Sequence, residues 1–213
     1  MKVPENKIEV VPHGDFSFYL KFKKKEDSYK CHSFTNVLFF GRIEPYKGLE
    51  YFIRAGELIS SPTKKVVFTI AGAGNIDPYR NLIINSKKFL IINQYFTDQE
   101  ISTIFENADI VVLPYLSASQ SGVIPIAYAF KKPVIVTSVG ALPETVENGV
   151  TGLIIPPRDV DALVNAITTL LADEDLRVTM GKNAYNKMKS DLSWEVIAKR
   201  HSEIYRQVLT KSK

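Results

Sequence analysis

Two cationic residues stand in one predicted loop directly after an apolar run. The stretch 37–48 reads VLFFGRIEPYKG, so Arg42 and Lys47 follow the run and a glycine, Gly41. Arginine offers a planar fork of N–H donors and lysine a compact positive charge, and both groups bind phosphate oxygens. The residue types and their spacing therefore predict a loop that binds an anionic ligand.

Other residues of the kind that contact ligands also follow apolar runs. In an open parallel sheet, ligands bind beyond the carboxyl ends of the strands, so these residues are predicted to line one rim. Each also has a structural alternative, because glycines make tight turns, aromatic residues pack and surface cations are solvated. The residues are Gly72, Gly74, Tyr95, Tyr115, Gln120, Ser121, Gly122 and Val123.

The loop 119–123, with the sequence SQSGV, is predicted to open an apolar helix that ends near Phe130. Unpaired N–H groups at a helix start bind phosphate, and Gly122 would let a phosphate group approach closely. Arg42 and Lys47 at the same place would hold two phosphate groups. The hypothesis is that the cations bind the diphosphate of a nucleotide.

The elements that position these residues follow from the hydrophobic period. Short runs rich in β-branched and aromatic residues are apolar on both faces, as in a parallel sheet covered by helices on each side. They alternate with segments of helical period, one opening with a capping box from Thr97 to Glu100 and another following Asp159. The alternation predicts a doubly wound α/β domain with a parallel sheet of about six strands. The predicted strands are 36–40, 66–71, 89–93, 109–113, 133–137 and 152–155.

Length and composition bound the class of protein. The 213 residues, 45% of them hydrophobic, are typical of one globular domain, and no run reaches the ~18 apolar residues of a membrane helix. Without a secretory signal at its start, the chain is expected to be soluble and intracellular. A single cysteine, Cys31, and scattered histidines argue against a metal site, and a net charge of +4 is too small to indicate nucleic acid. The basic run 21–25, KFKKK, is either a solvated linker or a contact with an acidic surface such as lipid headgroups.

Residues 1–34 fit this scheme poorly. IEVVP at 8–12 is predicted as a strand, and the polar residues after it as turn and linker. We therefore interpret the chain as part of a larger enzyme, with the α/β domain at 35–192 and a closing helix at 193–213.

Four blocks of sequence resemble the nucleotide-sugar-binding half of the group 1, retaining glycosyltransferases. The similarity covers roughly residues 35–210. Enzymes of this family have the GT-B fold, in which two Rossmann-like domains face each other across a cleft, and the resemblance implies that this chain is the C-terminal domain. The blocks are FFGRIEPYKGLEYFIRA at 39–55, FTIAGAGN at 68–75, ADIVVLPY at 108–115 and SGVIPIAYAFKKPVIVTSVGALPETVENGVTGLIIPP at 121–157.

The resemblance implies roles for individual residues. Arg42 and Lys47 match the residues that hold the donor diphosphate and neutralise the leaving group, and the backbone around Tyr95 would meet the base. The donor would be a UDP- or GDP-linked sugar, transferred to a hydroxyl with retained configuration and no obligatory metal, in cell-surface polysaccharide or glycoconjugate synthesis. Residues 8–15 would be the crossover from an N-terminal acceptor domain, and 193–213 the helix that crosses back. The whole enzyme would be cytoplasmic, with peripheral contact to the inner face of the membrane as a further expectation.

Both glutamates of the family pattern are missing. The family commonly carries one glutamate near the donor sugar and another on the ribose hydroxyls, and here these positions are Ala118 and Ile126. Neither side chain accepts a hydrogen bond. The SQSG loop resembles a sub-branch in which Gln-Ser-Gly replaces the first carboxylate, so Gln120 or Ser121 would serve the sugar or phosphate. Ribose recognition stays unexplained, and a non-catalytic nucleotide-sugar-binding module or a relic of the enzyme is therefore the alternative.

Two other classes of α/β protein fit less well. A dinucleotide oxidoreductase would use Gly72 and Gly74, but the third glycine of its motif is missing at Asp77 and the turn follows the second strand. A regulatory domain with a phosphorylated aspartate would need a clustered acidic pocket, which the sequence does not indicate.

Overall fold

Six parallel strands form the central sheet of the computed structural model, which describes residues 4, 7–23, 34–60 and 65–211. Their order is β3-β2-β1-β4-β5-β6, so the chain winds outward from β1 in one direction and from β4 in the other. This reversal makes the fold a doubly wound α/β domain, as the alternation of apolar runs predicts. All six predicted strands are confirmed to within two residues, as β1 Phe34–Phe40, β2 Lys65–Ala71, β3 Phe89–Ile92, β4 Ile110–Leu113, β5 Val134–Thr137 and β6 Gly152–Ile155.

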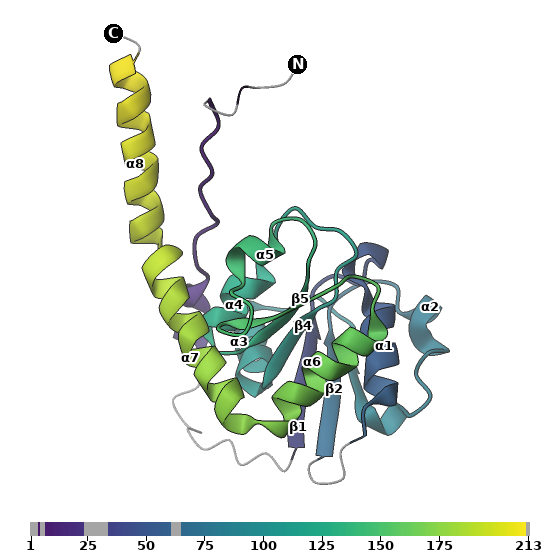
Figure 1. The fold of residues 1–213 in the computed structure, drawn as a ribbon. Coiled ribbons are helices and arrows are strands. Elements are labelled where there is room, and N and C mark those ends of the chain that lie inside the picture. Colours follow the sequence, from purple (N-terminus) through teal and green to yellow (C-terminus); the bar gives the residue numbers. More distant parts are fainter. Residues whose placement is uncertain (1–3, 5–6, 24–33, 61–64, 212–213) are drawn as a thin grey trace.

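Helices cover both faces of the sheet (Figure 1). Helices α1 and α6 pack together on one face, whereas α3, α4 and α7 cover the other. Among the helices of the described residues, none is both long and apolar enough to cross a membrane. The helices are α1 Leu49–Leu58, α2 Asp77–Arg80, α3 Asp98–Asn107, α4 Val123–Ala129, α5 Leu142–Thr145, α6 Val160–Ala172, α7 Glu174–Asp191 and α8 Trp194–Lys211, with the 3-10 turns η2 Ser17–Phe22, η3 Pro45–Lys47 and η4 Ser86–Lys88.

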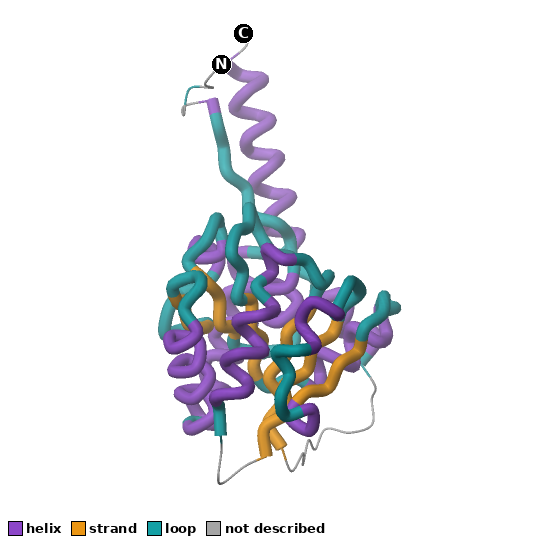
Figure 2. Tube along the Cα trace, turned by 90° about the vertical axis from the view of Figure 1, so that its right-hand side faces the viewer, coloured by secondary structure: helices purple, strands orange, loops and turns teal. Residues whose placement is uncertain are grey.

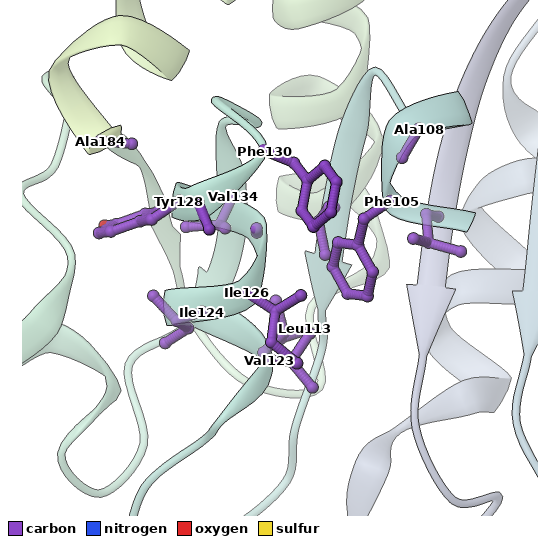
Figure 3. Close-up of a cluster of buried hydrophobic side chains, with 14 of the residues drawn as sticks. Phe105, Ala108, Leu113, Val123, Ile124, Ile126, Tyr128, Phe130, Val134 and Ala184 are labelled. Carbon is purple, nitrogen blue, oxygen red and sulfur yellow. The ribbon is translucent and has the colours of Figure 1, made fainter. Parts of the chain in front are cut away.

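Side chains that alternate along the central strands fill two separate cores. Leu38 and Val111 belong to the cluster with α3 and α4, and their neighbours Val37 and Ile110 belong to the cluster with α1 and α6. Figure 3 shows part of the first cluster, in which Phe105 of α3 lies beside residues of α4. Both faces of these central strands are buried, which is why the strands appear in the sequence as continuous apolar runs.

Local hydrogen bonds fix the helix starts. Thr97 Oγ1 accepts a hydrogen bond from the Glu100 N–H at 3.3 Å, and the Glu100 carboxylate accepts one from the Thr97 N–H at 2.8 Å. The predicted capping box of α3 is therefore confirmed. At the start of α6, the Asp159 carboxylate accepts a hydrogen bond from the Ala162 N–H at 2.8 Å.

The predicted strand at 8–12 is wrong. Residues 8–16 form neither helix nor strand, and Ile8 and Val10 are 52% and 65% exposed. A strand needs a neighbouring backbone to pair with, and no strand of the described sheet pairs with this segment. Instead, the segment and α8 leave the domain side by side in the same direction (Figures 1 and 2).

The end of this segment is fastened to the domain. The Asp15 N–H donates a hydrogen bond to the Leu192 carbonyl at 2.7 Å, and Trp194 Nε1 donates one to the Asp15 carbonyl at 3.0 Å. Tyr19 of η2 is buried in the core with α3 and α4. The segment and the start of α8 therefore meet at one place on the domain surface.

Candidate functional site

The first two strands end in glycines that pack against each other. Gly41 has a φ angle of 129°, which residues with side chains rarely adopt. A Cβ atom added to Gly72 would lie 1.7 Å from the Gly41 carbonyl oxygen, and one added to Gly74 would lie 2.7 Å from the Ile43 side chain. The structure thus brings Gly41, Gly72 and Gly74 together, and the close approach of two backbones leaves no room for a side chain.

The turn after β2 is held by a side chain from the end of β3. The Asn93 amide accepts a hydrogen bond from the Gly74 N–H at 3.1 Å and donates one to the Gly74 carbonyl at 3.0 Å. The Gly72 N–H also donates to the Ile92 carbonyl at 3.0 Å. Asn93 lies outside the residues predicted for the site, and the signal that would have indicated it is a polar amide at the end of an apolar run.

Lys47 is the last residue of η3, and its side chain points to a hydroxyl group. Its Nζ atom donates a hydrogen bond to the Tyr115 hydroxyl at 2.8 Å and lies 3.9 Å from the centroid of that ring. The backbone after Lys47 packs tightly against the loop after β4. A Cβ atom added to Gly48 would lie only 1.9 Å from the Pro114 carbonyl oxygen. Burial, together with the nearby charge of Arg42, lowers the pKa of Lys47 to about 8.

Tyr115 joins Lys47 to the loop before α4. Its hydroxyl lies 3.2 Å from Ser121 Oγ, which in turn accepts a hydrogen bond from the Val123 N–H at 3.3 Å. Burial raises the pKa of Tyr115 to about 12, so the phenol group stays neutral at ordinary pH. Tyr115 follows β4 directly and so lies on the rim that the sequence predicts, but the sequence assigns it no role in the site.

Arg42 is exposed on the same loop as Lys47. Its charge is close enough to lower the pKa of Lys47, and within the described residues its guanidinium group makes no hydrogen bond or ion pair. The structure therefore holds two cations near each other. Neither has a carboxylate partner in the part of the chain that the structure describes.

The remaining predicted residues lie around this group with different surroundings. Gln120 is exposed, and Tyr95, beyond β3, is 84% exposed. Gly122 has an ordinary helical conformation, with a φ angle of −67°. A Cβ atom added to Gly122 would lie 3.3 Å from the ring of Phe16. In the structure Gly122 thus makes room for a ring from the N-terminal segment, whereas the sequence predicts that it makes room for a phosphate group.

The two positions that depart from the glutamate pattern are apolar in the structure as well. Ile126 is buried on α4 and belongs to the apolar cluster of Figure 3. The backbone of Ala118 packs closely against Gly140, since a Cβ atom added to Gly140 would lie 1.5 Å from the Ala118 carbonyl oxygen. Within the described residues, no group of three or more His, Cys, Asp or Glu side chains is placed to hold a metal ion.

Fold and site together define an α/β domain that presents two neighbouring cations, Arg42 and Lys47, beyond the carboxyl ends of its strands. Residues 35–173, more than half of the chain, match the family of glycosyl transferases group 1. The chain belongs to this family.

Curated relatives extend the match. An uncharacterized glycosyltransferase of Methanocaldococcus jannaschii is 26% identical over 95% of this chain and 55% of its own length. A capsular polysaccharide biosynthesis glycosyltransferase of Staphylococcus aureus is 28% identical over 98% of this chain and 57% of its own length. The chain thus spans about half the length of these curated relatives.

Solved structures share the fold. The C-terminal domain of a group 1 glycosyl transferase from Francisella tularensis has a TM-score of 0.67 at 23% identity, over 75% of this chain and 87% of its own. An Anabaena protein, HepE, in complex with UDP has a TM-score of 0.72 at 22% identity, over 82% of this chain and 49% of its own. The fold of this chain is therefore that of the C-terminal domain of group 1, GT-B glycosyltransferases.

Proposed function

We propose that this chain is the donor-binding domain of a glycosyltransferase that moves a sugar from a nucleoside diphosphate to an acceptor hydroxyl with retained configuration. The observation that carries the proposal is the hydrogen-bonded group of Lys47, Tyr115 and Ser121 beside Arg42. This group presents two cations at the rim where open α/β sheets bind ligands. A diphosphate has the size and the negative charge to bind both cations at once.

The chemistry of such a transfer is chiefly electrostatic. Negative charge builds on the departing diphosphate, and positive groups that are already in place stabilise it. Arg42 would bind phosphate oxygens through its fork of donors and Lys47 would act as a point charge. Gly41 and Gly72 keep the two turns close enough for backbone groups to reach the ligand.

Other predicted residues take supporting roles in this proposal. The N–H groups of Ser121 and Gly122 would donate to phosphate, whereas the Val123 N–H is already partly engaged by Ser121 Oγ. Gln120 would contact the donor sugar or phosphate, and the backbone around Tyr95, at the exposed rim beyond β3, would meet the base.

The comparisons support the nature of the donor and of the pathway. The Anabaena structure contains UDP, and one relative acts in capsular polysaccharide biosynthesis. We therefore propose a UDP- or GDP-linked sugar as donor and cell-surface polysaccharide or glycoconjugate as the product, without an obligatory metal. The whole enzyme would pair this domain with an N-terminal acceptor domain, in the cytoplasm and in peripheral contact with the membrane.

A second candidate is a domain that binds a nucleotide sugar without transferring it. The observation in its favour is that Ala118 and Ile126 present no polar group, and that Ile126 is turned into the core. This candidate shares donor binding with the first and differs in turnover. A transfer assay on a protein that includes the acceptor half separates the two.

Calorimetric titration with UDP, GDP, ADP and NAD tests the proposal on the unsubstituted chain and on Arg42→Ala. We expect one nucleoside diphosphate to bind in the micromolar to millimolar range, and Arg42→Ala to weaken that binding about tenfold or more, as expected for a lost charge-assisted hydrogen bond. In the active enzyme the same substitution would raise the barrier by ~3 kcal/mol.

Arg206→Ala is the matched control, because Arg206 is an exposed arginine on α8. It should leave nucleotide affinity unchanged. A folded domain that binds no nucleoside diphosphate, or an Arg42→Ala variant with full affinity and turnover, would refute the proposed function.

A further inference from the structure

We propose that Tyr115 is a positioning residue, whose phenol group holds the Lys47 ammonium group and leaves the Ser121 hydroxyl hydrogen free for an anionic ligand. The inference rests on the proposed function, because it assigns a task within the diphosphate site. It starts from a buried polar group. Tyr115 is 1% exposed, yet its hydroxyl lies 2.8 Å from Lys47 Nζ and 3.2 Å from Ser121 Oγ.

Three contacts hold Tyr115 and its chain neighbour in place. The Tyr115 carbonyl oxygen accepts a hydrogen bond from Thr137 Oγ1 at 2.6 Å, at the end of β5. The ring of Tyr46 meets the Tyr115 ring edge-on, with the centroids 6.4 Å apart. The Leu116 N–H donates to the Tyr46 carbonyl at 2.7 Å, which joins the loops after β1 and β4. The phenol oxygen therefore lies at a point set by the ends of three strands.

The direction of each hydrogen bond follows from the hydrogens available. The Lys47 ammonium group only donates, so the Tyr115 oxygen accepts from it. Among the residues that the structure describes, the single phenol hydrogen then has one acceptor within reach, Ser121 Oγ. Ser121 Oγ also accepts from the Val123 N–H, so both of its lone pairs are occupied. Its own hydrogen is left for an acceptor from outside the protein, and a phosphate oxygen supplies one.

A phenol group suits this task because it accepts a hydrogen bond without cancelling charge. A carboxylate in its place would neutralise Lys47 and leave less attraction for a diphosphate. The face of the Tyr115 ring also attracts the ammonium group without neutralising it, since Lys47 Nζ lies 3.9 Å from the ring centroid. Tyr115 thus restricts a long, flexible side chain to one place and leaves its full positive charge to the ligand.

Calorimetric titration with UDP and with UMP tests this assignment on the unsubstituted chain, Tyr115→Phe, Lys47→Met and the double variant. Phenylalanine keeps the ring and its contacts and removes only the oxygen. We expect Tyr115→Phe to weaken UDP binding about tenfold and UMP binding less, because UMP lacks the second phosphate. In the Lys47→Met background the same substitution should weaken UDP binding by less than roughly threefold. If the domain selects GDP, then GDP and GMP take the place of UDP and UMP.

Tyr128→Phe is the matched control. Tyr128 is also buried, and its hydroxyl lies 2.7 Å from Thr151 Oγ1, so the substitution removes a comparable hydrogen bond. It should lower the thermal midpoint and leave UDP affinity unchanged. Wild-type affinity in Tyr115→Phe, or an undiminished loss in the Lys47→Met background, would overturn the inference and leave the proposed function standing. A folded, unsubstituted chain that binds no nucleoside diphosphate would overturn both.

Discussion

Two features of its surroundings disfavour the positive charge of Lys47. Burial disfavours the charged form most, and the neighbouring Arg42 disfavours it further, so the pKa falls to about 8. A diphosphate bound nearby would favour the charged form and raise this pKa again. Binding of the ligand and binding of a proton at Lys47 are therefore coupled.

We expect nucleotide affinity to fall as the pH rises past the pKa of Lys47, which is about 8. If only the protonated form binds, the protonated fraction and hence the affinity fall about tenfold between about pH 7 and pH 9. Calorimetric titration with UDP across this range measures the change. Lys47→Arg keeps its charge at every one of these pH values, so its affinity should stay level. A wild-type affinity that is independent of pH would exclude Lys47 from phosphate binding.

Residue types predicted the cations of the site but not the groups that hold them. Arg42 and Lys47 are recognisable because their charge, spacing and place after an apolar run are local features of the sequence. The partners Tyr115 and Asn93 lie far along the chain, and only the sheet brings them to Lys47 and Gly74. A contact of this kind has no local signature.

At the scale of elements, α3 shows how much a local signal can settle. Its start is fixed by reciprocal hydrogen bonds between Thr97 and Glu100, and hydrogen bonds to Thr97 lower the pKa of the Glu100 carboxyl. These contacts involve residues three positions apart, so the sequence alone contains them. The helix contributes Phe105 to the core that lies behind α4.

Thr97→Ala should lower the free energy of unfolding by ~1 kcal/mol, because it removes the side-chain oxygen that caps α3. Denaturant unfolding measures this change. Thr103→Ala on the same helix is the control, since its hydroxyl bonds back to the Gln99 carbonyl within the helix at 3.0 Å. That variant should stay within about 0.5 kcal/mol of the unsubstituted chain. Equal losses in the two variants would contradict the capping role.

The strands show what a local sequence pattern does not predict, namely whether a neighbouring strand is available for pairing. The runs of β1, β4 and β5 were predictable because both faces of these strands are buried, which requires continuous apolar sequence. IEVVP at 8–12 has a similar composition, yet it forms no strand because no described strand pairs with it. The ring of Phe16 beside Gly122 is equally non-local. An apolar run indicates that a strand can be buried, but not that a neighbour is available.

At the scale of the whole molecule, the proposed sugar transfer would need a second domain beside this one. The chain spans about half the length of its curated relatives, and its fold is that of a C-terminal glycosyltransferase domain. Sugar transfer needs an acceptor held in line with the donor and a site that excludes water. In the proposed function, the rim described above would supply donor contacts only.

We therefore expect these 213 residues to bind a nucleotide sugar but to transfer the sugar poorly. An assay with UDP- and GDP-linked sugars and simple sugar acceptors should show turnover no faster than hydrolysis of the donor in the same mixture. Titration with the corresponding nucleotide in parallel verifies that the site is intact. Efficient transfer by the domain alone would show that no second domain is needed.

The side chain of Asn93 has a consequence for the thermodynamics of binding. Its amide group pairs with both backbone groups of Gly74, so the turn after β2 is ordered by the fold itself. The conformational entropy of this turn is lost when the protein folds, and little of it remains to be lost when a nucleotide arrives. Affinity for a nucleotide in the proposed site would thereby be coupled to the local stability of the β3 edge of the sheet, where Asn93 is anchored.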